Sequence, residues 1–339
     1  MFIYYYNYKN KYILFNMNID ININNIQQNI LENIDYVQGD IKTLLENKTD
    51  INVLWGIQPR RLPTIDLLIP IFQIIKFIEN GLQITILLAD IHEMLDSSFL
   101  DMNIIKHRCD AYIELITNIL DFLNINSYNI NFVLGSEFQT SPAYTLDVYK
   151  ISALTSIHDI FEARDLDKTE NDINNEHMTT LLYPILQALD EKYTNCDIFY
   201  GSTSQKNMCT YSEKLMTNFQ SKKVVYLLED FTKGLDINFF DHIEQFENKL
   251  NEYSTDYIVY LYRKIFFPLV NKLNDNIVIN DNIINNVDDL ENRITKNEIN
   301  RDKLIETGVF YLSKYILKLY DKLSYTNFMK YYQYGWLHN

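Results

Sequence analysis

Three polar residues in one predicted helix have the spacing needed to face a common ligand. Tyr183 and Gln187 are four residues apart, and Asp190 follows three residues later in an otherwise apolar run. Residues at these intervals share one face of an α-helix, so the phenol, the amide and the carboxylate are expected to point the same way. Such a face can bind a small polar ligand, or it can be an incidental polar stripe on a core helix.

Other groups of reactive residues form no catalytic pattern. Thr203 and Ser204 have no acid at a triad spacing with His92 or His158. The cysteines are far apart in the sequence and have no histidine at metal-ligand spacing; they are Cys109, Cys196 and Cys209. The sequence therefore predicts neither a disulfide framework nor a metal site, and the cysteines are expected in the core.

The composition is that of a folded, acidic protein. The chain has 339 residues, a formal charge of -15 and only 8 glycines. Such an acidic surface argues against DNA as a partner, and the scarcity of glycine argues against a glycine-built phosphate loop. The most apolar stretch, from Ile65 to Ile78, is too short and too polar to cross a membrane. Since no signal peptide is recognised either, we expect a cytoplasmic protein without a membrane partner.

The order of the predicted elements indicates an α/β fold. A single amphipathic helix is expected from Ile26 to Leu45, because apolar residues recur there at steps of three and four. Beyond it, short apolar strands alternate with helices. The strands are expected at 50–55, 84–88, 130–134, near 198 and at 223–228, and the helices at 65–78, 103–123, 143–155, 179–193 and 207–219. This alternation is typical of a parallel sheet with helices on both faces.

Beyond about residue 236 the strand signals mostly stop, and helical periodicity returns at 257–273 and 303–323. We therefore divide the chain into three parts. They are an N-terminal extension with its amphipathic helix at 1–45, a Rossmann-type domain at 46–235 and a helical domain at 236–339.

Several segments, in the same order, resemble the tyrosyl-tRNA synthetases of the archaeal and eukaryotic cytosolic type. They are Leu54 to Gly56, Gly81 to Asp96 with its Ala-Asp-Ile-His sequence, Tyr144 to Tyr149, Leu182 to Glu191 and, in the tail, Ile265 to Leu269 and Asp289 to Glu291. The resemblance implies a class I synthetase, in which a Rossmann-type sheet joins tyrosine to ATP and a helical domain binds the anticodon.

The resemblance also assigns a tyrosine pocket. Its residues correspond to Tyr183, Gln187, Asp190, Gln205, Asp90 and His92. In the family, the counterparts of Tyr183 and Gln187 hold the substrate ammonium group, and the counterpart of Asp190 accepts a hydrogen bond from the phenol hydroxyl. Leu54 stands where the family has a tyrosine that shares this hydroxyl, so we expect weak tyrosine binding with poor discrimination against phenylalanine.

The residues that would handle ATP depart further from the family pattern. Thr64 takes the place of a histidine that stabilises the phosphate transition state, and Ser204 takes the place of the ribose-binding carboxylate. The turn at 59–62 is bulky, and the Lys-Met-Ser-Lys-Ser loop is missing, with Lys233 as the nearby cation. The resemblance therefore implies a catalytically impaired binding or regulatory homologue with no catalytic residue and no cofactor.

Two alternatives remain open at this point. The first is an active tyrosine-tRNA ligase, using ATP and magnesium, in which Lys222 or Lys223 replaces the missing loop. The second is a structural dimer that binds no ligand. Tyrosine-dependent exchange of pyrophosphate into ATP and a thermal shift with tyrosine distinguish the three hypotheses.

Macromolecular partners are also predicted from the resemblance. The segments 84–96 and 145–155 resemble regions at and around the family's subunit contact, which predicts a symmetric homodimer. The helical domain predicts weak binding of tRNA, with Asp302 near the family's guanine-contacting acid. Basic residues expected to assist it are Arg301, Arg263 and Lys264.

Overall fold

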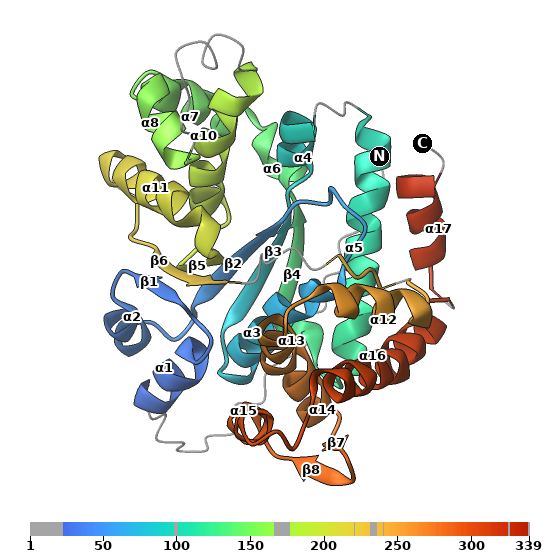
Figure 1. Ribbon diagram of the computed structural model, residues 1–339. Helices are drawn as coiled ribbons and strands as arrows, with labels where there is room; N and C mark the ends of the chain where they lie inside the picture. Colours follow the sequence, from blue (N-terminus) through green and yellow to red (C-terminus); the bar gives the residue numbers. More distant parts are fainter. Residues whose placement is uncertain are drawn as a thin grey trace, which may run out of the picture.

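A six-stranded sheet lies at the centre of the molecule (Figure 1). The computed structural model describes residues 23–97, 101–165, 177–219, 221–230, 236–239, 241–324 and 326–337. Its strands are β1 (Tyr36–Gln38), β2 (Asn52–Ile57), β3 (Gln83–Leu88), β4 (Ile130–Leu134), β5 (Ile198–Ser202) and β6 (Val225–Glu229). Their order across the sheet is β1-β6-β5-β2-β3-β4, and all pairings are parallel except that of β1 with β6. The predicted parallel sheet is confirmed.

Helices cover both faces of the sheet, which explains why the strands are apolar on both sides. On one face, strand residues such as Val53 and Ile86 pack with α3 (Leu68–Glu79) and α5 (Met102–Phe122). On the other face, Leu54 and Phe199 pack with Cys209 of α11 (Lys206–Asn218), beside α10 (Met178–Tyr193). Shorter helices complete this part: α4 (Asp90–Ser97), α6 (Gly135–Gln139), α7 (Pro142–Ser152), α8 (Ile157–Ala163), η1 (Ile65–Leu67), η2 (Ser127–Asn129) and η3 (Thr203–Gln205).

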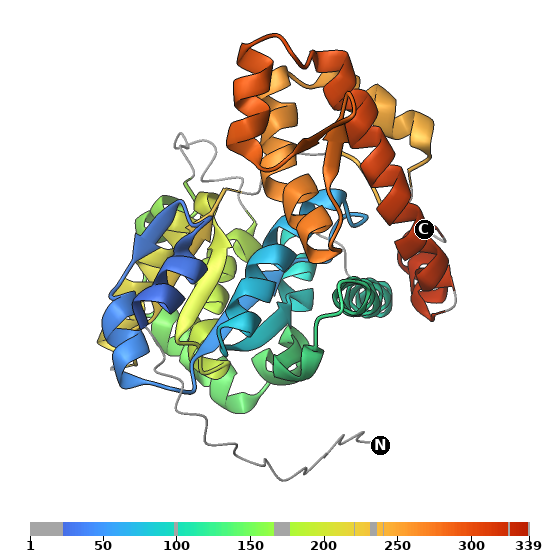
Figure 2. The same ribbon diagram turned by 90° about the horizontal axis from the view of Figure 1, so that it is seen from below.

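The C-terminal elements gather on one side of the sheet (Figure 2). They are α12 (Ile243–Glu252), α13 (Thr255–Leu261), the π-helical segment η4 (Tyr262–Phe266), α14 (Phe267–Lys272), the hairpin β7 (Ile277–Ile279) and β8 (Asn282–Ile284), α15 (Val287–Thr295), α16 (Arg301–Ser324), α17 (Phe328–Tyr332) and η5 (Gln333–Leu337). Phe246 of α12 and Leu312 of α16 belong to the same buried cluster as Ile71 of α3. One apolar core therefore continues from the sheet into these helices.

The predicted single helix from Ile26 to Leu45 is wrong. The chain forms α1 (Ile23–Leu31) and α2 (Ile41–Asn47), and β1 lies between them. Tyr36 pairs with Leu228 at the edge of the sheet, so hydrogen bonds to a distant strand replace those of a continuous helix. Gly39, at φ 100°, then turns the chain, and the Asp40 carboxylate caps α2 by accepting from the Thr43 amide.

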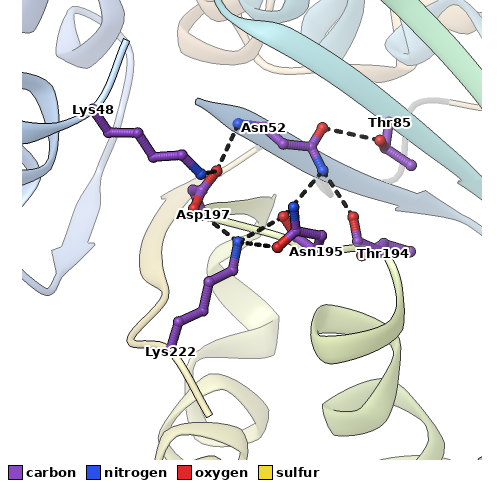
Figure 3. Close-up of polar contacts among 7 residues, drawn as sticks. All are labelled: Lys48, Asn52, Thr85, Thr194, Asn195, Asp197 and Lys222. Atoms are coloured by element: carbon purple, nitrogen blue, oxygen red, sulfur yellow. Dashed lines mark hydrogen bonds and ion pairs between the residues drawn. The ribbon is translucent and has the colours of Figure 1, made fainter. Parts of the chain in front are cut away.

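The amino ends of the strands are held together by a polar cluster around Asp197 (Figure 3). Asp197 is 3% exposed and accepts from Lys48 Nζ at 2.5 Å, Lys222 Nζ at 2.8 Å and the Asn52 amide at 2.9 Å. The Asn52 side chain in turn bonds the Thr194 carbonyl and the Thr85 hydroxyl. These contacts join the amino ends of β2, β3, β5 and β6.

The cysteines lie in the core, as predicted. All three are buried and free. Among the helices that the structure describes, none is both long enough and apolar enough to span a bilayer.

Candidate ligand-binding site

A cavity of about 160 Å³ lies at the carboxyl ends of β2, β3 and β5. It is lined by Leu54, Gly56, Gln58, Leu87, Ala89, His92, Tyr183, Gln187, Asp190, Phe199 and Gln205. The chain leaves β2 and β5 towards opposite sides of the sheet. In open α/β sheets, ligands bind at such a switch point. The volume is about ten times what a single water needs, so the cavity can hold a small molecule.

Five of the six residues predicted for the tyrosine pocket line this cavity. They are His92, Tyr183, Gln187, Asp190 and Gln205. The sixth, Asp90, does not line it. Its buried carboxylate accepts from the Ser136 amide at 2.9 Å, which fixes the start of α6 to the end of β3.

The Asp190 carboxylate is buried at one end of the cavity and accepts three hydrogen bonds. Oδ1 accepts from Gln139 Nε2 at 2.7 Å and from the Tyr144 hydroxyl at 2.8 Å, and Oδ2 lies 2.9 Å from His92 Nε2. Sequence reasoning missed Gln139 and Tyr144. Tyr144 begins one of the segments that carry the family resemblance, whereas nothing in the local pattern marks Gln139.

Tyr144 is held as a neutral donor. Burial, and next the neighbouring charge of Asp190, raise the pKa of the Tyr144 hydroxyl far above its ordinary value. This hydroxyl also lies 2.9 Å from the Leu186 carbonyl, but it donates its single proton to the carboxylate, because a hydrogen bond to a charged acceptor is stronger. Tyr144 therefore fixes α7 to the helix that carries Asp190.

Tyr183 and Gln187 differ in how tightly the protein already holds them. The Tyr183 ring packs edge-on against His92, with ring centroids 4.5 Å apart, and the Arg164 guanidinium lies over it at 4.9 Å. Burial raises the pKa of Tyr183 to about 12, so its hydroxyl stays protonated. The Gln187 amide is nearly buried yet makes no hydrogen bond to the described part of the chain, which leaves it available to a ligand.

Gln205 stands between this cavity and a second one of about 240 Å³. Its Oε1 accepts from the Ser202 amide at 2.9 Å. A Cβ at position 201 would lie 2.4 Å from this oxygen and 2.7 Å from the Phe199 ring, so any larger residue there would displace both side chains. The second cavity shares Gly56, Gln58 and Gln205 with the first and extends to Thr64, Asp66 and Tyr112.

Asp66 is the charged residue among those that line the second cavity. Burial raises its pKa, and the Thr64 hydroxyl donates to its carboxylate. Ser204 is exposed, and its hydroxyl bonds the Ser202 hydroxyl at 3.0 Å. The lining described for this cavity therefore offers one carboxyl group and no cationic side chain.

Comparison with known proteins identifies the family. The sequence model described as "tRNA synthetases class I (W and Y)" matches residues 46–237, more than half of the chain. The chain belongs to this family. Relatives named "Probable tyrosine--tRNA ligase, cytoplasmic" are 29% identical over 263 residues in Vairimorpha ceranae and 33% identical over 208 residues in Encephalitozoon cuniculi. These matches cover 74% and 61% of this chain, and 79% and 61% of the relatives.

Solved structures of class I synthetases share the fold of this chain. A tyrosyl-tRNA synthetase of Archaeoglobus fulgidus, complexed with L-tyrosine, has a TM-score of 0.77 at 20% identity and covers 89% of this chain and 99% of its own. That of Aeropyrum pernix has a TM-score of 0.79 at 16% identity and covers 91% of this chain and 97% of its own. At these identities the likeness concerns the fold.

The bulky turn at residues 59–62 does not line the second cavity. The Arg60 guanidinium pairs with Asp96 at 2.9 Å and with the buried Glu93 at 3.4 Å. Behind the turn, the Tyr112 hydroxyl donates to the Arg61 carbonyl at 3.0 Å. Arg60 therefore neutralises Glu93 and Asp96 of α4 and does not line the second cavity.

The two lysines considered as replacements for the missing loop lie elsewhere. Lys222 and Lys223 precede β6, at the amino edge of the sheet, opposite the cavities. Lys222 is bound to Asp197 and to the Asn195 carbonyl. The hypothesis that either lysine replaces that loop is therefore wrong for this structure. Lys233 lies outside the described residues.

The basic residues predicted to bind tRNA are all engaged by other parts of the protein. Lys264 is 9% exposed and donates to Glu229 at 2.7 Å, so its predicted contact with RNA is wrong. Arg301 donates to the backbone carbonyls of Asn251 and Tyr253, which makes it a brace between α16 and α12. Arg263 is exposed and paired with Glu291 at 2.6 Å, and Asp302 is exposed in the first turn of α16.

Proposed function

We propose that this synthetase-like chain binds tyrosine in the first cavity and has lost most of its capacity to activate tyrosine with ATP. One observation carries the proposal. Gln187, Asp190 and Gln205 converge with Tyr183 and His92 on a cavity of amino-acid size, while Asp66 provides the charge of the adjoining cavity. A half-buried carboxyl group without a cationic neighbour in the lining does not favour the triphosphate that adenylate formation requires.

Each half of the proposal has its own test. Isothermal titration with L-tyrosine is expected to show weak binding, and a thermal shift at millimolar tyrosine should accompany it. Tyrosine-dependent exchange of pyrophosphate into ATP is expected to stay at background. Absence of any response to tyrosine would favour a ligand-free scaffold.

The alternative is an active tyrosine-tRNA ligase, which the names of the relatives favour. Exchange activity that Asp190→Ala abolishes would establish this alternative. A cytoplasmic location forms part of both hypotheses, because these relatives are named as cytoplasmic.

A homodimer is the second part of the proposal. Four large apolar side chains on α7, α8 and the turn between them are more than half exposed: Leu146, Tyr149, Leu154 and Ile157. Such a concentration of exposed apolar residues favours a self-complementary interface. Light scattering should give twice the chain mass of 40.4 kDa, and Tyr149→Glu with Leu154→Glu should return it to the single-chain value. A single-chain mass for the unmodified protein at micromolar concentration contradicts the dimer.

Weak tRNA binding through the C-terminal helices is the third part. The surface is acidic overall, and Arg263 must exchange its Glu291 partner for a phosphate, so few phosphate contacts and a shallow salt dependence are expected. Fluorescence anisotropy with a tyrosine tRNA at low salt tests this part. Arg263→Glu should weaken binding, and Lys42→Glu on α2 serves as the control. No binding at tens of micromolar removes tRNA from the partners.

A further inference from the structure

The C-terminal segment packs on the helix that supports the turn at residues 59–62. α17 lies beside α5, and η5 follows along the same helix (Figure 1). The Gly335 carbonyl accepts from Arg108 Nε at 2.9 Å, and the Trp336 ring centroid lies 5.6 Å from Arg108 Cζ. The same ring lies 6.3 Å from that of Tyr112. Arg108 and Tyr112, one helical turn apart on α5, therefore both lie against η5.

Gly335 allows this close approach of η5 to α5. It is buried, and a Cβ at this position would lie 3.0 Å from Arg108 Cγ and 3.5 Å from the Arg108 amide nitrogen. The amide belongs to the backbone of α5 and cannot rotate away. A β-branched side chain, with two atoms beyond Cβ, would therefore press on α5 and displace η5.

The same two side chains of α5 also hold the turn. Arg108 Nη1 lies 3.4 Å from the Arg60 carbonyl, and the Tyr112 hydroxyl donates to the Arg61 carbonyl at 3.0 Å. A guanidinium group is planar and its N–H donors have fixed directions, so Nε and Nη1 cannot move independently. Loss of the Gly335 contact therefore also disturbs the contact between Arg108 and the turn.

The turn is flanked by residues that line the cavities. Gln58, directly before it, lines both cavities, and Pro63, directly after it, lines the second. Tyr112 lines the second cavity as well. Movement of the turn therefore moves the wall of the second cavity.

We propose that η5 controls the width of the second cavity through Arg108, which acts as a positioning residue. While η5 is docked on α5, Arg108 and Tyr112 hold the turn, and the wall beside it stays in place. When η5 leaves α5, Arg108 loses its orientation and the wall becomes movable. A partner that draws η5 off α5 thereby acts on the second cavity. Neither tyrosine nor ATP takes part in this coupling, so it can be tested apart from the proposed function.

Trypsin reports on the turn directly, because it cleaves after arginine and the turn contains Arg60 and Arg61. When opening is fast, cleavage follows the population of the locally opened chain. Gly335→Val should raise the cleavage rate at these two sites roughly 10-fold, the effect of losing one charge-assisted hydrogen bond. The rate at Lys223, at the opposite edge of the sheet, is measured in the same digest and should stay within about twofold of that in the unmodified protein.

Two further variants make the comparison specific. Arg108→Lys keeps the positive charge and loses the planar fork, so it should give the same selective increase at the turn. Leu337→Ala is the matched control in η5, because its side chain is 59% exposed, and its cleavage pattern should be that of the unmodified protein. If Gly335→Val does not fold, Gly335→Ala disturbs the same contact with a single added carbon.

A thiol in the second cavity reports on its wall. The native cysteines are buried, so Thr64→Cys provides an accessible thiol in the lining, and its reaction with iodoacetamide can be followed in the full-length protein. Addition of Gly335→Val should raise the labelling rate about threefold or more, whereas addition of Leu337→Ala should leave it unchanged.

Three results overturn the inference. Equal acceleration of cleavage at the turn and at Lys223 would mean that Gly335→Val destabilises the whole fold. Unchanged cleavage at the turn in both Gly335→Val and Arg108→Lys would mean that η5 does not hold it. Selective cleavage without faster labelling of Thr64→Cys would mean that the turn moves and the second cavity does not follow.

Discussion

The two cavities at the carboxyl edge of the sheet share three residues and yet differ in chemistry. The first takes its polar groups from α10, which presents Tyr183, Gln187 and Asp190 at helical spacing. The second depends on the turn after β2 and on the start of η1, where Thr64 and Asp66 lie. A helix that is packed on the sheet keeps its side chains in register, whereas a turn can change its residues without disturbing the core. One half of a site can therefore persist while the other is rebuilt.

Adenylate formation provides the largest expected contrast between the cavities. Loss of two or three transition-state donors, each worth roughly 3 kcal/mol, should slow the reaction by about 10⁴- to 10⁶-fold. Tyrosine-dependent pyrophosphate exchange measures it, with an active class I tyrosine-tRNA ligase as the positive control. A rate within about tenfold of that control would show that the second cavity is functional.

Glu191, at the carboxyl end of α10, should make the stability of the folded protein depend on pH. Burial raises the pKa of Glu191 to about 8 from an ordinary 4.5, although the Ser212 and Tyr226 hydroxyls donate to it at 2.6 and 2.9 Å. The folded protein keeps a proton that the unfolded chain releases above about pH 4.5. The contribution of Glu191 to stability is therefore complete below that pH and is lost as the pH rises towards 8.

Glu191→Gln copies the protonated side chain and should remove this loss. We expect the variant to exceed the unmodified protein by roughly 3 kcal/mol in free energy of unfolding at pH 7, and to match it near pH 4.5. Urea unfolding across this range measures the difference, with the exposed Glu247→Gln as control. Parallel stability curves for the variant and the unmodified protein would show that Glu191 is ionised in the folded state.

The smallest expected difference between the two cavities is in tyrosine affinity after substitution of Gln187 or Thr64. Since its amide has no hydrogen bond to the described protein, Gln187→Ala should change stability little but reduce tyrosine affinity by roughly 10-fold or more. Thr64→Val, on the second cavity, should leave tyrosine affinity within about twofold of the unmodified protein. Equal losses in the two variants, measured by titration calorimetry, would mean that both cavities contact the amino acid.

Much of the architecture follows from periodicity along the chain. The helix predicted at 179–193 is α10, found at Met178–Tyr193, and the buried apolar run from Ile84 to Leu88 is within β3. Boundaries shift by a residue or two because caps decide them, as Asp101 does for α5. Such elements can be predicted from the pattern of their own residues.

Errors arose where partners distant in sequence decide the structure. β1 pairs with a strand about 190 residues further along the chain, and no local period indicates this pairing. The hairpin of β7 and β8 is a local exception: its strands have three residues each, too few to show a period, and the turn is marked by Asn280 and Asp281 at positive φ. Gln139 reaches Asp190 across the sheet end, and Lys264 is buried by an acid that only the fold brings near.

The buried ion pair of Lys264 and Glu229 has a consequence for how the molecule comes apart. Glu229, at the end of β6, also accepts from the Tyr200 hydroxyl at 2.7 Å, so loosening η4 from the sheet would take the cationic partner from a carboxylate that is buried in the intact protein. That state is costly. The sheet and the C-terminal helices should therefore melt as one cooperative unit, with a single calorimetric transition, in spite of their different appearance in the sequence.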